Sequence, residues 1–239
     1  MGKFTRMFLA TGMVLAVAAS AVAAESTLLR LKYEEGETLT FKVTTMTLMN
    51  QMGMEVEQAQ TQYMDQKVIE VTEDAYLLEM CITRVISKSN HPMQGEKSFD
   101  SDKDDPSEDP QNAALAMMVG KKFTMRMDHL GRVHEVKGYS KIGEELLKKL
   151  EEQMGDNPQF AMIKMMFQDM FSDKFMKKMM DQSNTHFPEE PVEVGTEWKM
   201  ESSFAIPMFG ELGMKLEHSV SAITDETVEI KFQGSMKSK

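Results

Sequence analysis

Alternation of apolar and polar residues is the feature that most restricts the fold of this chain. In the segment 38–49, Leu39, Phe41 and Val43 recur at every second position, with polar residues between them. The segment 76–82 has the same period. A period of two places alternate side chains on one face of a β-strand. The sequence therefore predicts antiparallel strands with one covered face and one solvated face.

These strands fall into two groups with a helical stretch between them. Residues 25–93 and 187–239 each have the pattern of a β meander, and residues 113–138 contain a β-hairpin pattern after a short helix. Residues 139–186 have the apolar spacing of helices. We therefore predict a single α+β domain over residues 25–239, in which a large curved antiparallel sheet packs against the central helical segment.

The two predicted meanders share a sequence pattern. The segment 68–78 resembles the segment 220–230, and upstream the segment 35–39 resembles 194–198. Two explanations stay open, an internal duplication and a chance likeness between alternating strands with acidic turns. After a duplication, the two meanders are expected to join into one sheet. Such a sheet twists and curls, and its concave apolar face needs a cover.

The predicted cover is a helical segment rich in methionine. The chain contains 26 methionines, and this side chain is flexible enough to fill irregular apolar spaces. A curled sheet under such a helix is suited to hold a long apolar ligand. The candidate ligand or lid residues are Met162, Met165, Met166, Phe167, Met170, Phe171, Met176, Met179 and Met180.

The same methionines allow a second interpretation. Met162 and Met165, like Met176 and Met179, are three positions apart and therefore share a helix face. Thioether sulfur is a soft ligand that suits Cu(I). Phe and Ile residues interleave with the methionines, however, and this favours contact with the core or with an apolar ligand. We predict no cofactor and no metal site, and the alternative is a Met-rich Cu(I)-binding periplasmic protein.

Residues 1–24 have the pattern of a secretory signal peptide. Lys3 and Arg6 precede an apolar run, and the small residues 21–23 fit a cleavage site. An uncleaved membrane anchor is the alternative, but the apolar run is at the lower limit for a bilayer span. We predict an exported protein, periplasmic or extracellular, that is soluble after cleavage. The mature chain has no predicted membrane span, and its oligomeric state is not indicated.

Charge and cysteine content exclude several kinds of partner and site. The formal net charge is −11, which argues against nucleic acid because phosphate binding needs clustered Lys and Arg. It also argues against anionic lipid headgroups as the main attraction. Cys81 is the only cysteine, so no internal disulfide can form. Its place in an apolar strand favours a structural role over a reactive thiol.

The acidic segment 94–112 is predicted to be a disordered surface loop, because it is dense in charge and poor in apolar residues. Its aspartates at alternate positions from Asp100 resemble the start of a calcium-binding loop. Asp105 and Gln111 stand where such a loop needs glycine and glutamate. Only weak calcium attraction is therefore expected in the run Asp100–Asp109.

The sequence contains no recognisable catalytic motif. It lacks the nucleophile-elbow, zinc-protease, phosphate-loop and dinucleotide patterns. Its five histidines are scattered, and His129 and His134, which flank one predicted turn, are expected to be solvated. We predict no catalytic residues and no enzymatic activity.

Two stretches carry a resemblance to a known group of proteins. They are GKKFTMRMDHLGRVHEVKG at 120–138 and FPEEPVEVGTEW at 187–198. Here the chain resembles a family of exported bacterial proteins of unknown function, many of which are lipoproteins. This chain lacks their lipid-bearing cysteine, and the resemblance implies no catalytic residues. In architecture alone, the chain is also similar to the curved-sheet carriers that shuttle lipoproteins or lipids in the bacterial envelope.

The preferred hypothesis is a non-enzymatic envelope protein that binds an apolar ligand or an apolar segment of an envelope protein. The Cu(I)-binding protein is one alternative. A structural or interaction protein without a small ligand is the other.

Overall fold

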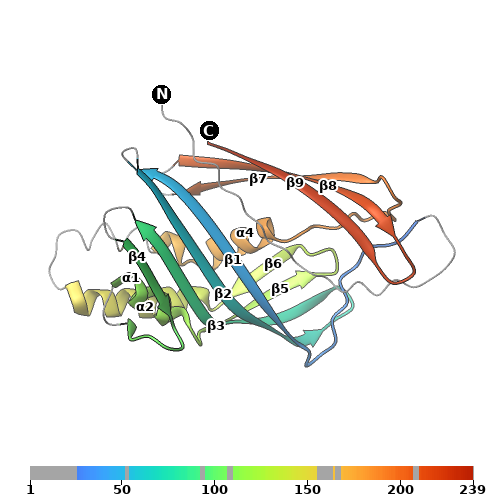
Figure 1. Cartoon of the computed structure of the whole chain (residues 1–239). Coiled ribbons are helices and arrows are strands. Elements are labelled where there is room, and N and C mark those ends of the chain that lie inside the picture. Colours follow the sequence, from blue (N-terminus) through green and yellow to red (C-terminus); the bar gives the residue numbers. More distant parts are fainter. Residues whose placement is uncertain are drawn as a thin grey trace.

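The computed structural model describes most of the chain from residue 26 onward (Figure 1). The proposed signal segment 1–24 lies outside the described residues. The described residues are 26–51, 54–91, 95–106, 110–154, 164, 168–206 and 210–238.

A large antiparallel sheet forms the first half of the molecule. Its hydrogen-bonded order is β1-β2-β3-β5-β6, and β4 pairs with residues 86–91 at the C-terminal end of β3. The strands are β1 (Thr38–Gln51), β2 (Met54–Val71), β3 (Ala75–His91), β4 (Gly95–Asp100), β5 (Lys122–Asp128) and β6 (Val133–Lys137). Along β1, residues 39, 41 and 43 are half-buried and their neighbours are exposed, as the alternation predicts. The predicted α+β class with a large, open antiparallel sheet is confirmed.

The second meander forms a sheet of its own. It has the order β7-β8-β9, with β7 (Glu197–Ile206), β8 (Gly210–Ile223) and β9 (Val228–Ser238). The prediction that both meanders join in one sheet is therefore wrong, because the strand pairs of the described residues divide into two sheets. In Figure 1 the smaller sheet lies above the larger one.

Helix α4 (Asp173–Ser183) explains this division. It lies between β6 and β7, which are the edge strands of the two sheets (Figure 1). The backbone N–H of Val133 on β6 donates to Asp181 Oδ1 at 2.8 Å. Gln182 Nε2 donates to the carbonyl oxygen of Ser203 on β7 at 3.2 Å. Edge strands leave backbone groups unpaired, so side chains of α4 supply partners that a neighbouring strand would otherwise provide.

The two meanders repeat the same backbone geometry. Gly36 N–H donates to the Val68 carbonyl at 2.9 Å, and Gly195 N–H donates to the Val220 carbonyl at 2.9 Å. Both glycines have positive φ, and the strand register shifts immediately after each valine. Val68 pairs with Leu78, as Val220 pairs with Ile230. A shared bulge and register favour duplication over chance, because bulges occur at defined positions.

One hydrophobic core joins the two sheets. It includes Val68 from the first meander and Val220 from the second, both almost fully buried. The segment before β1 closes this core, since Thr27 pairs with Val192 and Leu29 is fully buried. The β2–β3 and β8–β9 hairpins therefore share this core at the ends that contain Val68 and Val220.

Helix α2 (Tyr139–Met154) begins against the start of α4. The backbone N–H of Ser140 donates to Asp173 Oδ1 at 2.8 Å, so the first turn of α4 caps α2. Asp173 also follows Ser172, whose side chain accepts from Phe175 N–H and caps α4. The two caps fix α4 relative to α2.

The acidic segment is more ordered than predicted. The prediction of a disordered loop over 94–112 is wrong for residues 95–100, which form β4, and for the end of the segment, where α1 (Pro110–Met118) begins. Phe99 is only 2 % exposed and anchors this segment in the protein. Arg84 Nε donates to Asp100 Oδ1 at 2.8 Å, and this hydrogen bond holds the pKa of the Asp100 carboxyl well below its usual range.

That contact also bears on calcium. Asp100, the first expected ligand, is already paired with a guanidinium group. Among the described residues, no group of three or more His, Cys, Asp or Glu side chains is placed to hold a metal ion.

Candidate functional site

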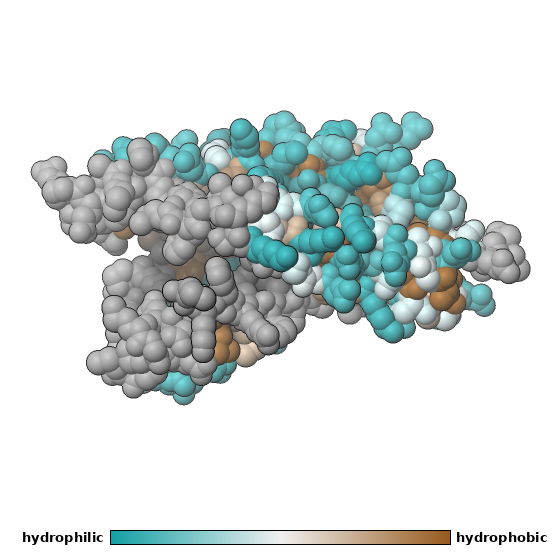
Figure 2. Space-filling model, turned by 90° about the horizontal axis from the view of Figure 1, so that it is seen from above, coloured by the Kyte–Doolittle hydropathy of each residue, from teal (hydrophilic) through white to brown (hydrophobic). Residues whose placement is uncertain are grey.

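The smaller sheet has one charged face and one apolar face. On the outward face, Lys199 pairs with Glu217 at 3.3 Å and Lys215 pairs with Glu201 at 3.5 Å. Seen from above, the described surface is mainly hydrophilic, with small hydrophobic patches (Figure 2). The inward face carries the alternate residues of each strand: Trp198, Met200, Ser202, Met214, Leu216, His218, Val220, Val228, Ile230 and Phe232.

This inward face is only partly covered. At the end nearest the core, Val220 is 2 % exposed, and Val228 and Ile230 pack against the core. Two positions further along β9, Phe232 is 54 % exposed although it pairs with the buried His218. Full burial of a Phe side chain contributes about 1.5–3 kcal/mol. The exposed ring therefore leaves apolar surface that a bound molecule could cover.

A pocket of about 660 Å³ lies where α4 meets the edge of β7. We call it the seam pocket, because it lies beside the α4 seam between the two sheets. Its wall on the β7 side includes Trp198, Met200 and Ser202 from the inward face. Its opposite wall includes Gln182 and His186, near the end of α4. The pocket thus adjoins the apolar face of the smaller sheet.

Unpartnered polar atoms gather at this pocket. Among the described residues, five buried side-chain atoms have no hydrogen-bond partner in the protein. Trp198 Nε1, Ser202 Oγ and Gln182 Oε1 belong to residues that line the seam pocket, and His218 Nδ1 lies behind Trp198. A buried polar group without a partner costs about 1–3 kcal/mol. Because buried polar groups are normally paired, this concentration of unpaired atoms marks the pocket as a candidate binding site.

Trp198 and His218 form a stacked pair across β7 and β8. Their ring centroids are 5.0 Å apart, and the rings are nearly parallel at 7°. His218 is 4 % exposed. Burial lowers the pKa of His218, and the nearby His186 lowers it further. His218 is therefore neutral at neutral pH, and its ring adds an uncharged wall behind the indole.

The predicted lid residues are placed as follows. Met162, Met165, Met166 and Phe167 lie outside the described residues. Phe171, Met176 and Met180 pack against the core, Met170 is half-buried, and Met179 is 37 % exposed. Phe171 also stacks on Tyr139 at 5.5 Å between centroids. Three of the described residues therefore contribute to the core, and the role of the set as a lid or in ligand binding stays a prediction.

Two methionine sulfurs near α4 accept hydrogen bonds. Asn184 Nδ2 donates to Met127 Sδ at 3.2 Å, and the backbone N–H of His186 donates to Met200 Sδ at 3.4 Å. Both bonds hold the segment after α4 against the sheets. Thioethers here act as weak acceptors inside the fold.

The two turn histidines each contact another residue. His129 Nδ1 lies 2.6 Å from Tyr76 Oη, and His134 Nε2 lies 2.9 Å from Asp128 Oδ2. Cys81 is half-buried, and burial raises the pKa of its thiol. A raised pKa leaves less of the nucleophilic thiolate.

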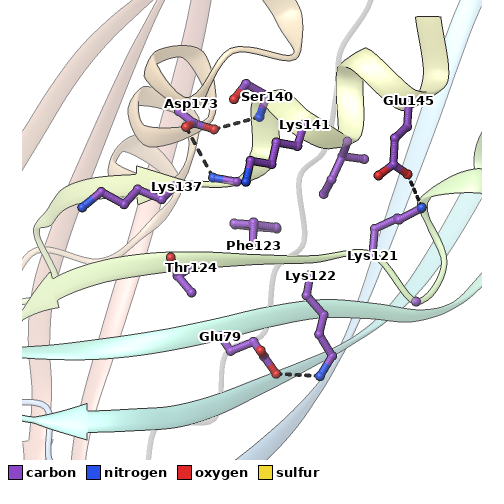
Figure 3. Close-up of a pocket in the computed structure, with 13 residues that line it drawn as sticks. Glu79, Lys121, Lys122, Phe123, Thr124, Lys137, Ser140, Lys141, Glu145 and Asp173 are labelled. Atoms are coloured by element: carbon purple, nitrogen blue, oxygen red, sulfur yellow. Dashed lines mark hydrogen bonds and ion pairs between the residues drawn. The ribbon is translucent and has the colours of Figure 1, made fainter. Parts of the chain in front are cut away.

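A second cleft, of about 760 Å³, lies between β5 and the start of α2 (Figure 3). Lysine side chains line it, and carboxylates pair with Lys121, Lys122 and Lys137. Lys122 Nζ lies 2.8 Å from Glu79 Oε1, and Lys121 is bonded to Glu145. The Asp173 carboxylate already accepts from the N-terminus of α2. The charges of this cleft are largely satisfied within the protein, so the seam pocket is the stronger candidate.

Comparison with known proteins identifies the family of this chain. A family of unknown function, DUF6263, matches residues 73–239. The chain belongs to this family. The matched region contains all of α4 and β7–β9 and therefore the entire seam pocket. No curated protein and no solved structure matches the chain. Among the helices of the described ranges, none has the length and apolar character needed to cross a membrane.

Sequence reasoning did not find the seam pocket. Trp198 was visible as the only tryptophan, but its period-two position predicts only a covered face. Ser202 and His218 follow the same period, so their inward orientation could have been noticed as polar residues on an apolar face. Gln182 gave no signal, because its contact with β7 depends on where α4 lies.

Proposed function

We propose that this protein is a non-catalytic, exported binding protein that holds an apolar ligand, or an apolar segment of a partner, against the inward face of β7–β9. The observation that carries this proposal is the exposed Phe232 ring on an apolar face whose other end is buried in the core. The outward face of the same sheet carries ion pairs between charged side chains. Polar and apolar residues thus lie on opposite faces, and the exposed Phe232 belongs to the apolar one.

Helix α4, which adjoins this face at the edge of β7, is suited to adjust to a ligand. None of the residues of α4 is fully buried, so the helix makes fewer tight contacts than a core helix. Met176 and Met180 are its contacts with the core. Methionine repacks with little strain because it is unbranched and flexible. Small shifts of α4 can therefore accommodate apolar chains of different shape.

Export rests on residues 1–24, whose basic start, apolar run and small-residue exit fit a signal peptide. Mature protein is expected to begin at Ala24 or Glu25. N-terminal sequencing of the protein from the culture fraction or periplasm measures this directly. Recovery of the intact N-terminus from a membrane pellet would contradict export in soluble form.

The binding proposal is tested by mass spectrometry of organic extracts from protein purified out of its native envelope. An apolar compound is expected to co-purify with the wild type. The Phe232→Ser variant should lose most of it, because the exposed part of the apolar face is removed. Gln233→Ser is the matched control, since Gln233 is the next residue of β9 and lies on the outward face.

Two results would contradict the proposal. One is the absence of any enriched apolar compound in the wild type. The other is equal recovery from Phe232→Ser and wild type, which would place the compound elsewhere on the protein.

A further inference from the structure

We propose that the seam pocket binds the neutral, hydrogen-bonding head group of the ligand, a group such as a hydroxyl or an amide that both donates and accepts. This inference rests on the proposed function, since it specifies the polar end of the molecule whose apolar part would lie on β7–β9. It assigns a role to Trp198, Ser202 and Gln182, which neither the family match nor the fold explains.

The unpartnered atoms define the complementary chemistry. Trp198 Nε1 is a donor only, Gln182 Oε1 is an acceptor only, and Ser202 Oγ can be either. A ligand that satisfies the first two must offer one acceptor and one donor. A hydroxyl group offers both, and so does an amide. An alkyl chain end offers neither and would leave all three atoms unpaired.

The head group should be uncharged. Charged side chains also line the pocket, but Arg132 is paired with Glu189, Lys199 with Glu217 and Asp181 with His186. None of the three unpartnered atoms belongs to an ionisable side chain, and burial lowers the pKa of His218 behind Trp198. A buried ion needs a paired charge, because desolvation of an isolated charge is far more costly than that of a polar group. A carboxylate head could not donate a hydrogen bond to Gln182 Oε1, since both groups only accept hydrogen bonds. The geometry therefore favours a neutral head over a fatty-acid carboxylate.

Access to these atoms requires one side chain to move. Gln182 is anchored to β7 by a single long hydrogen bond, from Nε2 to the Ser203 carbonyl at 3.2 Å. Its Oε1 atom has no protein partner, so rotation of the amide breaks one bond and exposes the pocket wall beside Ser202. Gln182 is half-buried on a helix that has no fully buried residue, which keeps the cost of that rotation small. Gln182 thus acts as the movable wall of the pocket.

The test uses the fluorescence of Trp198, which is the only tryptophan in the chain. Purified mature protein, freed of bound lipid, is titrated with monododecanoylglycerol and separately with dodecanoate, both below their micelle concentrations. The two probes share one acyl chain and differ in the head group. Wild type should bind the glycerol ester about tenfold or more tightly, a difference of roughly 1.4 kcal/mol.

Variants separate the head-group site from the apolar face. Ser202→Ala and Gln182→Met should each reduce the preference for the glycerol ester several-fold while dodecanoate binding changes little. Ser235→Ala is the control, because Ser235 lies on the exposed outward face of β9. A thermal melt of each variant checks folding, and removal of an unpartnered hydroxyl is not expected to destabilise the protein.

The outcomes are distinct for the two proposals. Equal binding of both probes, or a preference for dodecanoate, overturns the neutral-head inference while the apolar face still stands. A wild-type preference that survives in both pocket variants overturns the assignment to the seam pocket. If neither probe changes Trp198 fluorescence and no apolar compound co-purifies, both the proposed function and the neutral-head inference are overturned.

Discussion

Phe99→Ala tests whether the acidic segment is anchored by its one large apolar residue. Phe99 is 2 % exposed, so nearly all of its side chain is removed from water. A buried Phe covers about 150–250 Å², which at about 25 cal/mol per Å² contributes about 4–6 kcal/mol. Alanine retains part of this, and Phe-to-Ala changes in cores cost about 3–5 kcal/mol. We expect a loss of about 3 kcal/mol, since β4 is a short strand and, among the described residues, pairs with β3 alone.

The assay is urea unfolding followed by linear extrapolation of the unfolding free energy. Ser98→Ala is the matched control, because Ser98 is exposed on the same strand and should change stability by less than about 0.5 kcal/mol. Limited proteolysis with an enzyme specific for acidic residues adds a local measurement. Phe99→Ala should be cut within residues 95–106 under native conditions, whereas wild type resists. A loss below about 1 kcal/mol, or equal cleavage of the two proteins, would refute the anchoring role of Phe99.

Other predictions concern the buried histidine, a turn and the seam pocket. The folded-state pKa of His218 is lowered by burial, so its contribution to stability is present above the unfolded pKa and is lost as pH falls below about 6.5. Urea unfolding between about pH 8 and pH 5 should show this loss, and His218→Gln should weaken it. Gly131→Ala should destabilise more than Gly120→Ala in thermal melts. Both positions have positive φ, but only at Gly131 would the new Cβ lie 2.5 Å from the Thr185 carbonyl oxygen; equal effects would remove that explanation. Ser202→Ala should raise the unfolding free energy by about 1 kcal/mol, because it removes an unpartnered buried hydroxyl, and a clear loss would show that Ser202 has a structural partner.

His218→Gln also tests the duplication. Gln66 occupies the corresponding position of the first meander, since it pairs with Leu39 as His218 pairs with Trp198. Both residues are 4 % exposed, and each has one unpartnered nitrogen. Glutamine should therefore fit at residue 218 without a large change in stability. A loss of stability comparable to that of a core truncation would show that the two sites are not equivalent in packing.

The sequence by itself determined the strands, the turns and the repeat. Each depends on neighbours close in the chain, because a period of two reports which side of a strand is covered. The likeness between 68–78 and 220–230 reappears as one bulge and one register in both meanders. The cap of α4 is local in the same way, since the side chain of Ser172 acts within its own turn.

Only the tertiary structure decided how these elements associate. The acidic segment appeared unable to fold because local composition hides the long-range contacts of Phe99 and Asp100, which depend on β3. The two meanders form separate sheets because α4 occupies the space between β6 and β7. The seam pocket exists for the same reason. Gln182 belongs to a helix and Trp198 to a strand, and they line one pocket only because of where α4 lies. The apolar periodicity of either segment does not predict that position.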